Sequence, residues 1–563
     1  MKNKTAEINK PYKIAEDNVF AQAAALTAAS FVLQILLFVY RIIITRFSGA
    51  GGLGVFQLAM PYYSILASVS LSGITVAVSR LTVEKVTIGQ EHQTRAVVST
   101  ALRLFLILLS ICSVVTFLFP DLIAGRILGD MRTKASMLLF IPCLFLTGFE
   151  NIYKAFFYGA KHIKPNIISE PTELVIRIIT IFALLYLNRY NLTPERTAFF
   201  MVIGMIVSEV FSFFFLGAYY KIYQNRRDAI PQKDLKPKDS KPTATTTLRE
   251  NFFQNLQDFK NISPKLNIRG EITRIAVPIC ASSVLMTIIN SVNTILLPQR
   301  LVVAGMAQTQ AVEMLGILMG MSMPLVTLPI IFISPLMNIV LPRIASAKKL
   351  GDSADLNKKI AATLQMCSFM TFPAMAVVAA LGRPLCMLMY RNELAGAYVI
   401  PLMLSSGFMY IQIVTGSILN AIDKQKQLAV YNVIDGILHI ICTYFFVAMP
   451  QFGVYGFMIG NFVSCLMGTI LNLATVTRTV KLKFNFKNWL VLPAISGIYT
   501  GFMTHFTYSF AIRLSLPPVL AVVIAILFAI LIYTAISELR GVSLVGRVNA
   551  IISARATKKS RRI

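Results

Sequence analysis

The chain has 563 residues, of which 56% are hydrophobic and only 14% are charged. A soluble domain carries about 25% charged residues, so this composition excludes a water-soluble globular protein, and with it a disordered chain, a coiled coil and a disulfide scaffold. The formal net charge is +28. In a soluble protein this excess would indicate nucleic acid, but here the basic residues lie in short segments between apolar runs, which is typical of membrane loops.

Motifs for catalysis and for metal binding are absent from the sequence. The seven cysteines and four histidines are scattered, without a C-x-x-C pair or a Cys/His cluster, so we expect neither a metal site nor disulfides. The sequence also lacks a P-loop, a nucleophile elbow and an H-E-x-x-H motif. We therefore expect no enzymatic activity and no resident cofactor.

Fourteen apolar stretches are long enough for a helix to cross a membrane, which needs about 20 residues. In chain order we predict spans at residues 20–45, 53–79, 96–119, 136–158, 167–188, 197–220, 272–298, 311–341, 360–381, 397–421, 428–448, 453–477, 488–507 and 516–537. The eighth span contains Pro324, Pro329 and Pro335, so we expect it to be kinked or tilted.

A long polar segment divides these spans into six before it and eight after it. The predicted fold is an all-α integral membrane protein with about 14 transmembrane helices, arranged as two pseudo-symmetric six-helix lobes plus a C-terminal helix pair. The predicted parts are a cytoplasmic N-terminus (1–19), an N-lobe (20–220), a basic cytoplasmic linker (221–271), a C-lobe (272–477), the helix pair (488–537) and a basic cytoplasmic tail (538–563).

The distribution of Lys and Arg predicts the orientation of the chain in the membrane. With the N-terminus in the cytoplasm, basic residues in the inside segments outnumber those in the outside segments by about four to one, as the positive-inside rule requires. Both termini are therefore expected in the cytoplasm. The loss of a single span would place alternate loops on the wrong side, so the bias also supports the number of spans.

Ionisable residues inside spans are costly and indicate functional sites. Arg41 lies deep in the first span, where substrate binding and snorkelling to the outer interface are about equally good explanations. Arg274 opens the seventh span. Glu173 and Arg177 are four residues apart in the fifth span, so they can pair on one helix face, either as a structural clasp or as a substrate contact.

Other buried polar residues have no partner nearby in the sequence. Glu150 and Glu209 are expected to face a wet cavity or another span. In the C-lobe, Asp435 lies mid-span with Asn432 one turn earlier, and Asn293 lies in the seventh span. Grouped carboxylate and amide oxygens could hold Na⁺ or relay a proton, although interhelical hydrogen bonding is their commoner use.

Several stretches of the sequence resemble a known family. The segment FVYRIIITRFSGAGGLGVFQ (38–57), followed by Pro61 and SGITVAVSR (72–80), is similar to the opening of stage V sporulation protein B and related polysaccharide exporters. The segments PQRL (298–301), MPLVTLP (323–329) and LPRI (341–344) continue the resemblance. These proteins belong to the multidrug/oligosaccharidyl-lipid/polysaccharide (MOP) superfamily, which also contains the MurJ-type lipid II flippases.

The resemblance implies a two-lobed, MATE-like bundle that alternates between the membrane faces and moves a polyprenyl-pyrophosphate-linked glycan across the bacterial plasma membrane. By similarity, Arg41 and Arg274 match cavity arginines, while Gln34 and Ile65 stand where the lipid II flippases carry further arginines, which weakens the case for lipid II itself. Asn293 stands where relatives often carry Asp. Coupling to Na⁺ or H⁺ is an open expectation, and the expected partners are membrane lipids and cell-wall or polysaccharide synthases.

Two other functions remain open at this point. A cation-coupled multidrug exporter of the same fold would also suit the basic loops, but it would favour acidic residues in the N-lobe over Arg41. A non-transporting scaffold for cell-wall synthases would not need Arg41 or Arg274 at all. Substitution of these two arginines therefore separates the alternatives.

Overall fold

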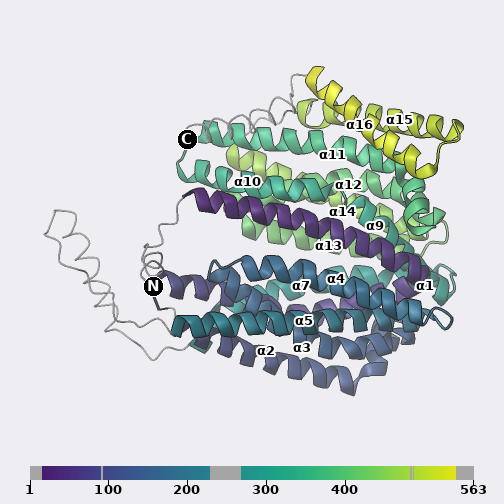
Figure 1. Ribbon diagram of the computed structural model, residues 1–563. Helices are drawn as coiled ribbons and strands as arrows, with labels where there is room; N and C mark the ends of the chain where they lie inside the picture. The colour runs from purple at the N-terminus through teal and green to yellow at the C-terminus, as the bar shows by residue number, and fades with distance from the viewer. Residues whose placement is uncertain (1–15, 91–92, 229–267, 482–484, 486, 540–563) are drawn as a thin grey trace, which may run out of the picture.

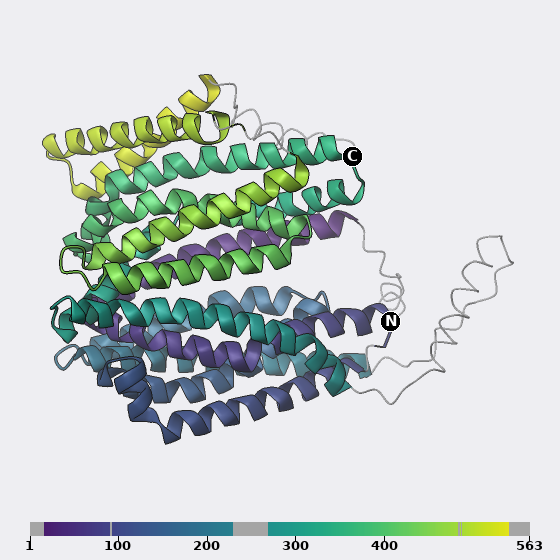
Figure 2. The same cartoon turned by 180° about the vertical axis from the view of Figure 1, so that it is seen from behind.

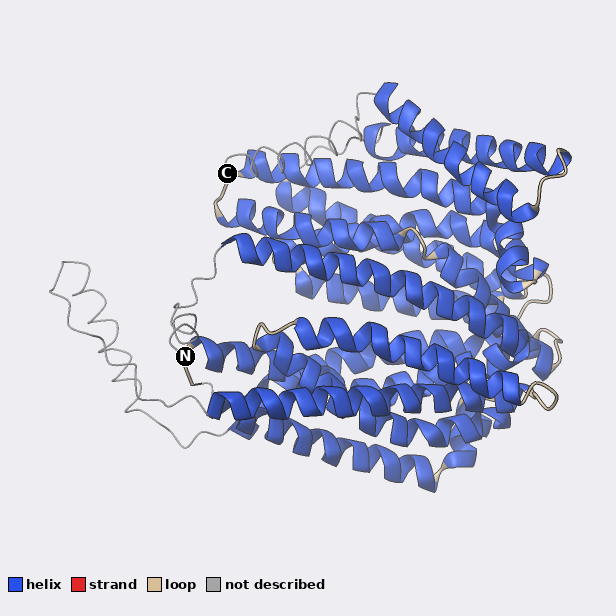
Figure 3. Cartoon of the chain, in the orientation of Figure 1, coloured by secondary structure: helices blue, strands red, loops and turns tan. Residues whose placement is uncertain are grey.

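The computed structural model describes residues 16–90, 93–228, 268–481, 485 and 487–539, and all regular structure in these residues is helical (Figure 3). The α-helices are α1 (Glu16–Thr87), α2 (Gln93–Leu118), α3 (Lys134–Gly159), α4 (Lys164–Leu187), α5 (Pro194–Asp228), α7 (Ile268–Val303), α8 (Gln308–Leu315), α9 (Met323–Val326), α10 (Ile330–Lys349), α11 (Ser353–Tyr390), α12 (Glu393–Ala421), α13 (Gln425–Phe446), α14 (Val454–Val480), α15 (Leu492–Arg513) and α16 (Pro518–Leu539). Helices are expected here because a spanning segment must pair its own backbone groups within the hydrocarbon core.

Each predicted span coincides with helical structure. Eleven segments of the described residues are long and apolar enough to cross a membrane, and one of them, Leu33–Thr87, contains two of the predicted spans. Helices α4 and α15 coincide with predicted spans but are not among the eleven. The all-α membrane fold is thus confirmed, and the total of fourteen spans stays a prediction.

The ends of the predicted linker are helical. Helix α5 continues to Asp228 and α7 begins at Ile268, so each helix extends into the segment that we predicted as a linker, 221–271. Residues 229–267 lie outside the described residues, as do most of the predicted N-terminal segment and nearly all of the predicted tail.

Two interruptions divide long apolar runs into separate helices. Helix α1 consists of two helices that meet at Gly49, whose φ of 65° and ψ of 174° suit a residue without a Cβ atom. The predicted eighth span is broken, as expected from its prolines: it forms α8, a π-helix (Gly316–Ser322), α9 and then α10, which begins after Pro329.

The helices form two bundles (Figures 1 and 2). The first bundle contains the second half of α1 and helices α2 to α5, and the second bundle contains helices α8 to α16. The first half of α1 runs along the second bundle, whereas α7 runs along the first bundle, as both views show. These two helices contact both bundles and therefore link them.

The bundles lie close together at the end that contains Gly49 and further apart at the opposite end, where α5 ends and α7 begins (Figure 1). At the Gly49 end, a Cβ atom on Gly54 would collide with the carbonyl oxygen of Val312, and one on Gly316 would collide with that of Ala50. Because glycine lets two backbones approach closely, these positions allow α1 to pack directly against α8 and the π-helix.

At the same end, one side-chain hydrogen bond joins the bundles, and two others hold the first half of α1 to the second bundle and α7 to the first. Arg46 Nε donates to the carbonyl oxygen of Met389 at 2.7 Å. Gln299 Nε2 donates to the carbonyl of Ile127 at 3.0 Å, and Gln308 Nε2 to that of Gly129 at 2.7 Å. The Gly49 end is therefore closed by backbone packing and by hydrogen bonds to main-chain carbonyls.

Candidate functional site

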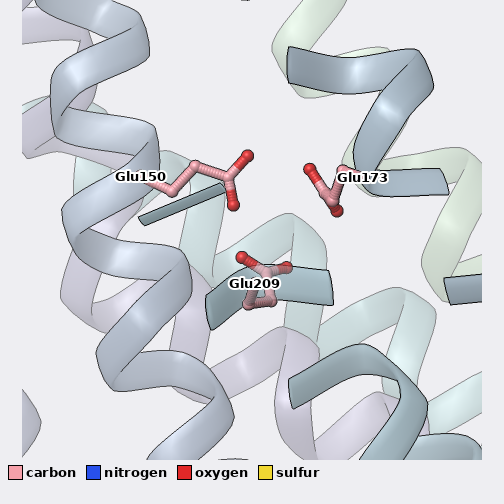
Figure 4. A group of neighbouring side chains, drawn as sticks. All are labelled: Glu150, Glu173 and Glu209. Carbon is pink, nitrogen blue, oxygen red and sulfur yellow. The ribbon is translucent and has the colours of Figure 1, made fainter. Parts of the chain in front are cut away.

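Five charged side chains from three helices meet inside the first bundle. Glu150 and Lys154 belong to α3, Glu173 and Arg177 to α4, and Glu209 to α5. We call these five residues the buried ionic cluster. Figure 4 shows the three carboxylates pointing toward one another, and one oxygen from each lies within 4.8 Å of the others.

Ion pairs connect the members of the cluster across the three helices. Arg177 Nη2 lies 2.5 Å from Glu173 Oε1 and 3.4 Å from Glu209 Oε1. Lys154 Nζ pairs with Glu150 Oε1 and lies 3.6 Å from Glu173 Oε2. Arg177 Nε also donates to Ser208 Oγ at 3.0 Å. The pair that we predicted from the spacing of Glu173 and Arg177 is present, and it is part of this larger network.

The expectation that Glu150 and Glu209 lack a partner in the sequence is wrong for Glu150. Lys154 follows it by four residues in the same helix, and the two side chains form an ion pair. The spacing that predicts the Glu173–Arg177 pair applies equally here, so the signal was present in the sequence. Lys154 lies near the end of the predicted fourth span, where a basic residue is also compatible with a loop.

Arg41 lines a cavity between the first half of α1 and the second bundle. The cavity has a volume of about 270 Å³. Its lining residues are Gln34, Leu37, Phe38, Arg41, Pro324, Thr327, Leu328 and Ile330. Arg41 is exposed, and among the residues that the structure describes no carboxylate lies within ion-pair distance of it. Its guanidinium is therefore available to an anion from outside the chain.

Arg274 is also exposed, but it lies at a different level of the molecule. At a rise of 1.5 Å per residue, Arg41 is about 12 Å along the helix from Gly49, whereas Arg274 is about 44 Å from the end of α7 at Val303. The Ser291 hydroxyl donates to the carbonyl of Pro61 at 3.4 Å, and both residues are about 18 Å from the Gly49 end by the same measure. The two arginines are therefore about 30 Å apart in depth.

The polar residues of the predicted cation site are not brought together as one group. Asp435 Oδ1 and Gln412 Nε2 both lie close to Gly468, so Asp435 faces α12 and α14. Its neighbour Gly436 packs against Ile289 of α7. By helical rise, this contact places Asn293 about 8 Å from Asp435 and about 12 Å from Asn432 in depth. Oδ1 of Asp435 and Oδ1 of Asn293 are both buried without a hydrogen-bond partner among the described residues.

This arrangement has solved relatives. A structure described as "Lipid II flippase MurJ, inward closed conformation" aligns with a TM-score of 0.64 and 16% identity, over 92% of this chain and 99% of that one. A structure described as the inward-facing conformation of a multidrug resistance MATE family transporter of the MOP superfamily gives a TM-score of 0.60 and 13% identity, over 81% and 99% of the chains. The fold is thus that of the MOP-superfamily transporters.

Sequence comparison places the chain in a family within this class. Residues 19–348, more than half of the chain, match the family model described as "Polysaccharide biosynthesis protein", and the chain belongs to this family. It is 21% identical to "Stage V sporulation protein B" of Bacillus subtilis (strain 168) over 474 residues, which are 84% of this chain and 86% of the relative. The family resemblance seen in the sequence is confirmed, and the relatives are membrane transporters and flippases.

Proposed function

We propose that this protein is a flippase that moves a polyprenyl-pyrophosphate-linked glycan, either lipid II or a polysaccharide repeat unit, across the bacterial plasma membrane by alternating access. The family and the similarity to a lipid II flippase support the class of cargo. The observation that carries the proposal is Arg41, an unpaired guanidinium in a cavity between the first half of α1 and the second bundle. Arg binds phosphate oxygens through two parallel hydrogen bonds.

The physical task explains why such an arginine is needed. Each ion that moves from water into hydrocarbon carries an effective penalty of several kcal/mol, so a pyrophosphate cannot cross without help. A polar cavity that presents a guanidinium replaces part of the lost hydration. The polyprenyl tail needs no such site, because it stays in lipid while the head group moves between the bundles.

Because Arg41 and Arg274 lie at different depths, the head group of the cargo binds them one after the other and not both at once. A diphosphate is much shorter than the separation of about 30 Å between the levels of Arg41 and Arg274. In our proposal Arg274 attracts the head group at the end where the bundles diverge, and Arg41 receives it near the closed Gly49 end. Arg177 lies close to Tyr40, the residue before Arg41, but its charge is already balanced by Glu173, 2.5 Å away.

The orientation and the energy source belong to the same proposal. The positive-inside bias puts both termini in the cytoplasm, so the Gly49 end faces outward and the diverging end faces inward. The membrane potential supplies about 2.3 kcal/mol per charge per 100 mV and biases the direction in which the empty protein opens. The chain itself performs no catalytic step. Synthases that make or consume the lipid-linked glycan are its expected partners.

Complementation tests this function. The chain is expressed in a bacterium depleted of its lipid II flippase, and growth is compared for the native chain, Arg41→Ala, Arg274→Ala and Arg103→Ala. Arg103 is an exposed residue of α2 and serves as the matched control. We expect the native chain and Arg103→Ala to restore growth and Arg41→Ala to fail at equal protein level.

The remaining outcomes separate the alternatives. Stable membrane expression without rescue by the native chain contradicts lipid II as cargo and leaves another polyprenyl-linked glycan, which is then tested in a strain that lacks its own exporter. Rescue that survives both Arg41→Ala and Arg274→Ala contradicts the assigned roles of the arginines and favours a scaffold. Export of a cationic dye by the native chain favours the drug-exporter reading.

A further inference from the structure

The buried ionic cluster does not balance its own charge. With all members ionised, Glu150, Glu173 and Glu209 contribute three negative charges, and Lys154 and Arg177 contribute two positive ones. The cluster therefore carries one negative charge in excess. Glu150 is only 2% exposed and Glu209 only 5%, so solvent does not screen this charge, and an unpaired buried charge is strongly unfavourable.

The excess charge can be placed on particular atoms. Four of the six carboxylate oxygens contact a cationic side chain: both oxygens of Glu173, Oε1 of Glu150 and Oε1 of Glu209. In the described part of the chain, Oε2 of Glu209 is buried and has no hydrogen-bond donor within reach. The Glu209 carboxylate points into the cluster, toward the carboxylates of Glu150 and Glu173 (Figure 4). Two acceptors that face each other are stable only when something positive lies between them.

Other titratable groups interact electrostatically with members of the cluster. They are Tyr40 and Tyr63 of α1, Cys143 of α3 and Glu170 of α4. The tyrosines and the cysteine are uncharged at neutral pH at their ordinary pKa values, and Glu170 accepts a hydrogen bond from Tyr158 at 3.4 Å. None of these groups supplies the missing positive charge.

A metal cation does not fit this place as well as a proton does. Na⁺, Ca²⁺ and Mg²⁺ require several oxygen ligands that are free to turn toward the ion. Here most carboxylate oxygens are already in contact with Lys154 or Arg177, and those two cations would repel a third one at close range. A proton needs only one covalent bond to one oxygen and one acceptor, which is what Glu209 and Glu150 offer.

We propose that Glu209 is protonated at neutral pH and shares its proton with Glu150, so that this carboxyl pair is the proton-binding site of the transporter. In this state the O–H of Glu209 donates to Glu150, and the cluster is neutral. Proton release to water breaks that O–H bond and leaves a net charge of −1. The site lies in the first bundle, apart from the polar residues around Asp435.

The position of the cluster suggests how protonation of Glu209 is coupled to a movement of one bundle relative to the other. Arg177 is close to Tyr40 in the first half of α1, the helix that carries Arg41 and contacts both bundles. A net negative charge beside this helix favours an arrangement in which water or Arg41 reaches the cluster. This coupling rests on the proposed transport function, whereas the protonation of Glu209 does not.

Infrared difference spectroscopy on the full chain in nanodiscs tests the protonation. A protonated carboxyl group gives a C=O stretching band that a carboxylate lacks. We expect this band at neutral pH in the native protein, and we expect its loss in Glu209→Gln, in which a neutral amide replaces a neutral acid of the same shape. The matched control is Glu313→Gln on the exposed side of α8, which should keep the band.

Two results would overturn the proposal. A band of unchanged intensity in Glu209→Gln shows that Glu209 is ionised, because any other protonated carboxyl group, such as Asp435, contributes equally to both proteins. A band that disappears when NaCl replaces choline chloride at constant pH shows that Na⁺ displaces the proton and that the site is a sodium site. Because no cargo is present, a failed complementation experiment leaves this result unchanged.

A distance measurement tests the coupling separately. Spin labels at Ile88 and Leu350, both exposed at the end where the bundles diverge, report the separation of the bundles in a background that lacks the native cysteines. We expect the distance distribution of the native protein to change between acidic and alkaline pH. Glu209→Gln should keep the acidic distribution at both values. A pH response that remains in Glu209→Gln would assign the switch to another group.

Discussion

The two bundles bury polar side chains in opposite ways. In the first bundle, five charged residues from α3, α4 and α5 contact one another, and ion pairs join all three helices. In the second bundle, Asp435 has no cation within ion-pair distance among the described residues, and its neighbour Gln412 is an uncharged amide. Charge is thus concentrated and largely compensated in one bundle, and isolated in the other.

This difference indicates in which bundle the loss or gain of one charge affects stability and conformation. A compensated network is costly to break, since removal of one member leaves another member buried and unpaired. An isolated carboxyl group can lose its charge without affecting any partner. The first bundle is therefore suited to a switch that depends on one additional proton, and the second bundle is suited to packing and hydrogen bonding.

The largest expected effect follows from removing one cation of the cluster. Lys154→Met deletes the partner of Glu150 and one of the partners of Glu173. Breaking a buried ion pair typically costs about 3–5 kcal/mol, so we expect the free energy of unfolding to fall by that order. Denaturant titration in detergent micelles, followed by the fluorescence of Trp489, measures it.

Two further variants make this test specific. Lys358→Met removes an exposed lysine of α11 and should leave the free energy of unfolding within about 0.5 kcal/mol of the native value. Glu150→Gln combined with Lys154→Met removes both charges and should recover more than half of the loss, because interacting sites are not additive. A Lys154→Met protein as stable as the native one would contradict the buried pair.

Hydropathy predicts the helices well because it depends on local composition. It predicts a helix even where charges interrupt the pattern, as in α4 with Glu173 and Arg177. It does not predict that the first half of α1 runs along the second bundle while α7 runs along the first (Figure 2). That exchange depends on contacts between residues far apart in the chain, such as Arg46 with Met389.

The site is predictable only where its contacts are local. A spacing of four residues predicts the ion pair of Glu173 and Arg177, and the same spacing predicts the ion pair of Glu150 and Lys154. The contacts of Lys154 with Glu173 and of Arg177 with Glu209 join different helices, so they exist only after α3, α4 and α5 have packed. For the same reason the sequence does not show that Arg41 and Arg274 lie at different depths.

A smaller effect is expected from the isolated carboxyl group of the second bundle. Asp435→Asn keeps the shape of the side chain and removes no ion pair. We expect the melting temperature to be unchanged or slightly raised, since Asn removes a largely buried carboxyl group whose Oδ1 has no partner among the described residues. If Asp435→Asn lowers the melting temperature as much as Lys154→Met does, Asp435 has a charged partner, and the two bundles do not differ in the way described.

The smallest effect is expected from an ion pair of the second bundle that lies outside the spanning helices. Lys348 Nζ is 2.8 Å from Asp423 Oδ2, in the turn between α12 and α13. The hydrogen bond from Lys348 and its positive charge lower the pKa of Asp423 below its ordinary value. Both partners are partly or fully exposed to solvent, so the pair is far weaker than those of the cluster.

The pH dependence of this pair has a definite sign. Because folding lowers the pKa of Asp423, the stabilisation is present above the unfolded value of about 3.9 and is lost as the pH falls through the lower folded value. Asp423→Asn removes the charge, and Asn tolerates the positive φ of 61° at this position. We expect the small difference in melting temperature between the two proteins to be equal at pH 7 and pH 5 and to shrink below about pH 4. If the difference in melting temperature changes between pH 7 and pH 5, the pH dependence belongs to another group. If it is as large as the difference in melting temperature between the native protein and Lys154→Met, exposed pairs stabilise this fold as strongly as buried ones.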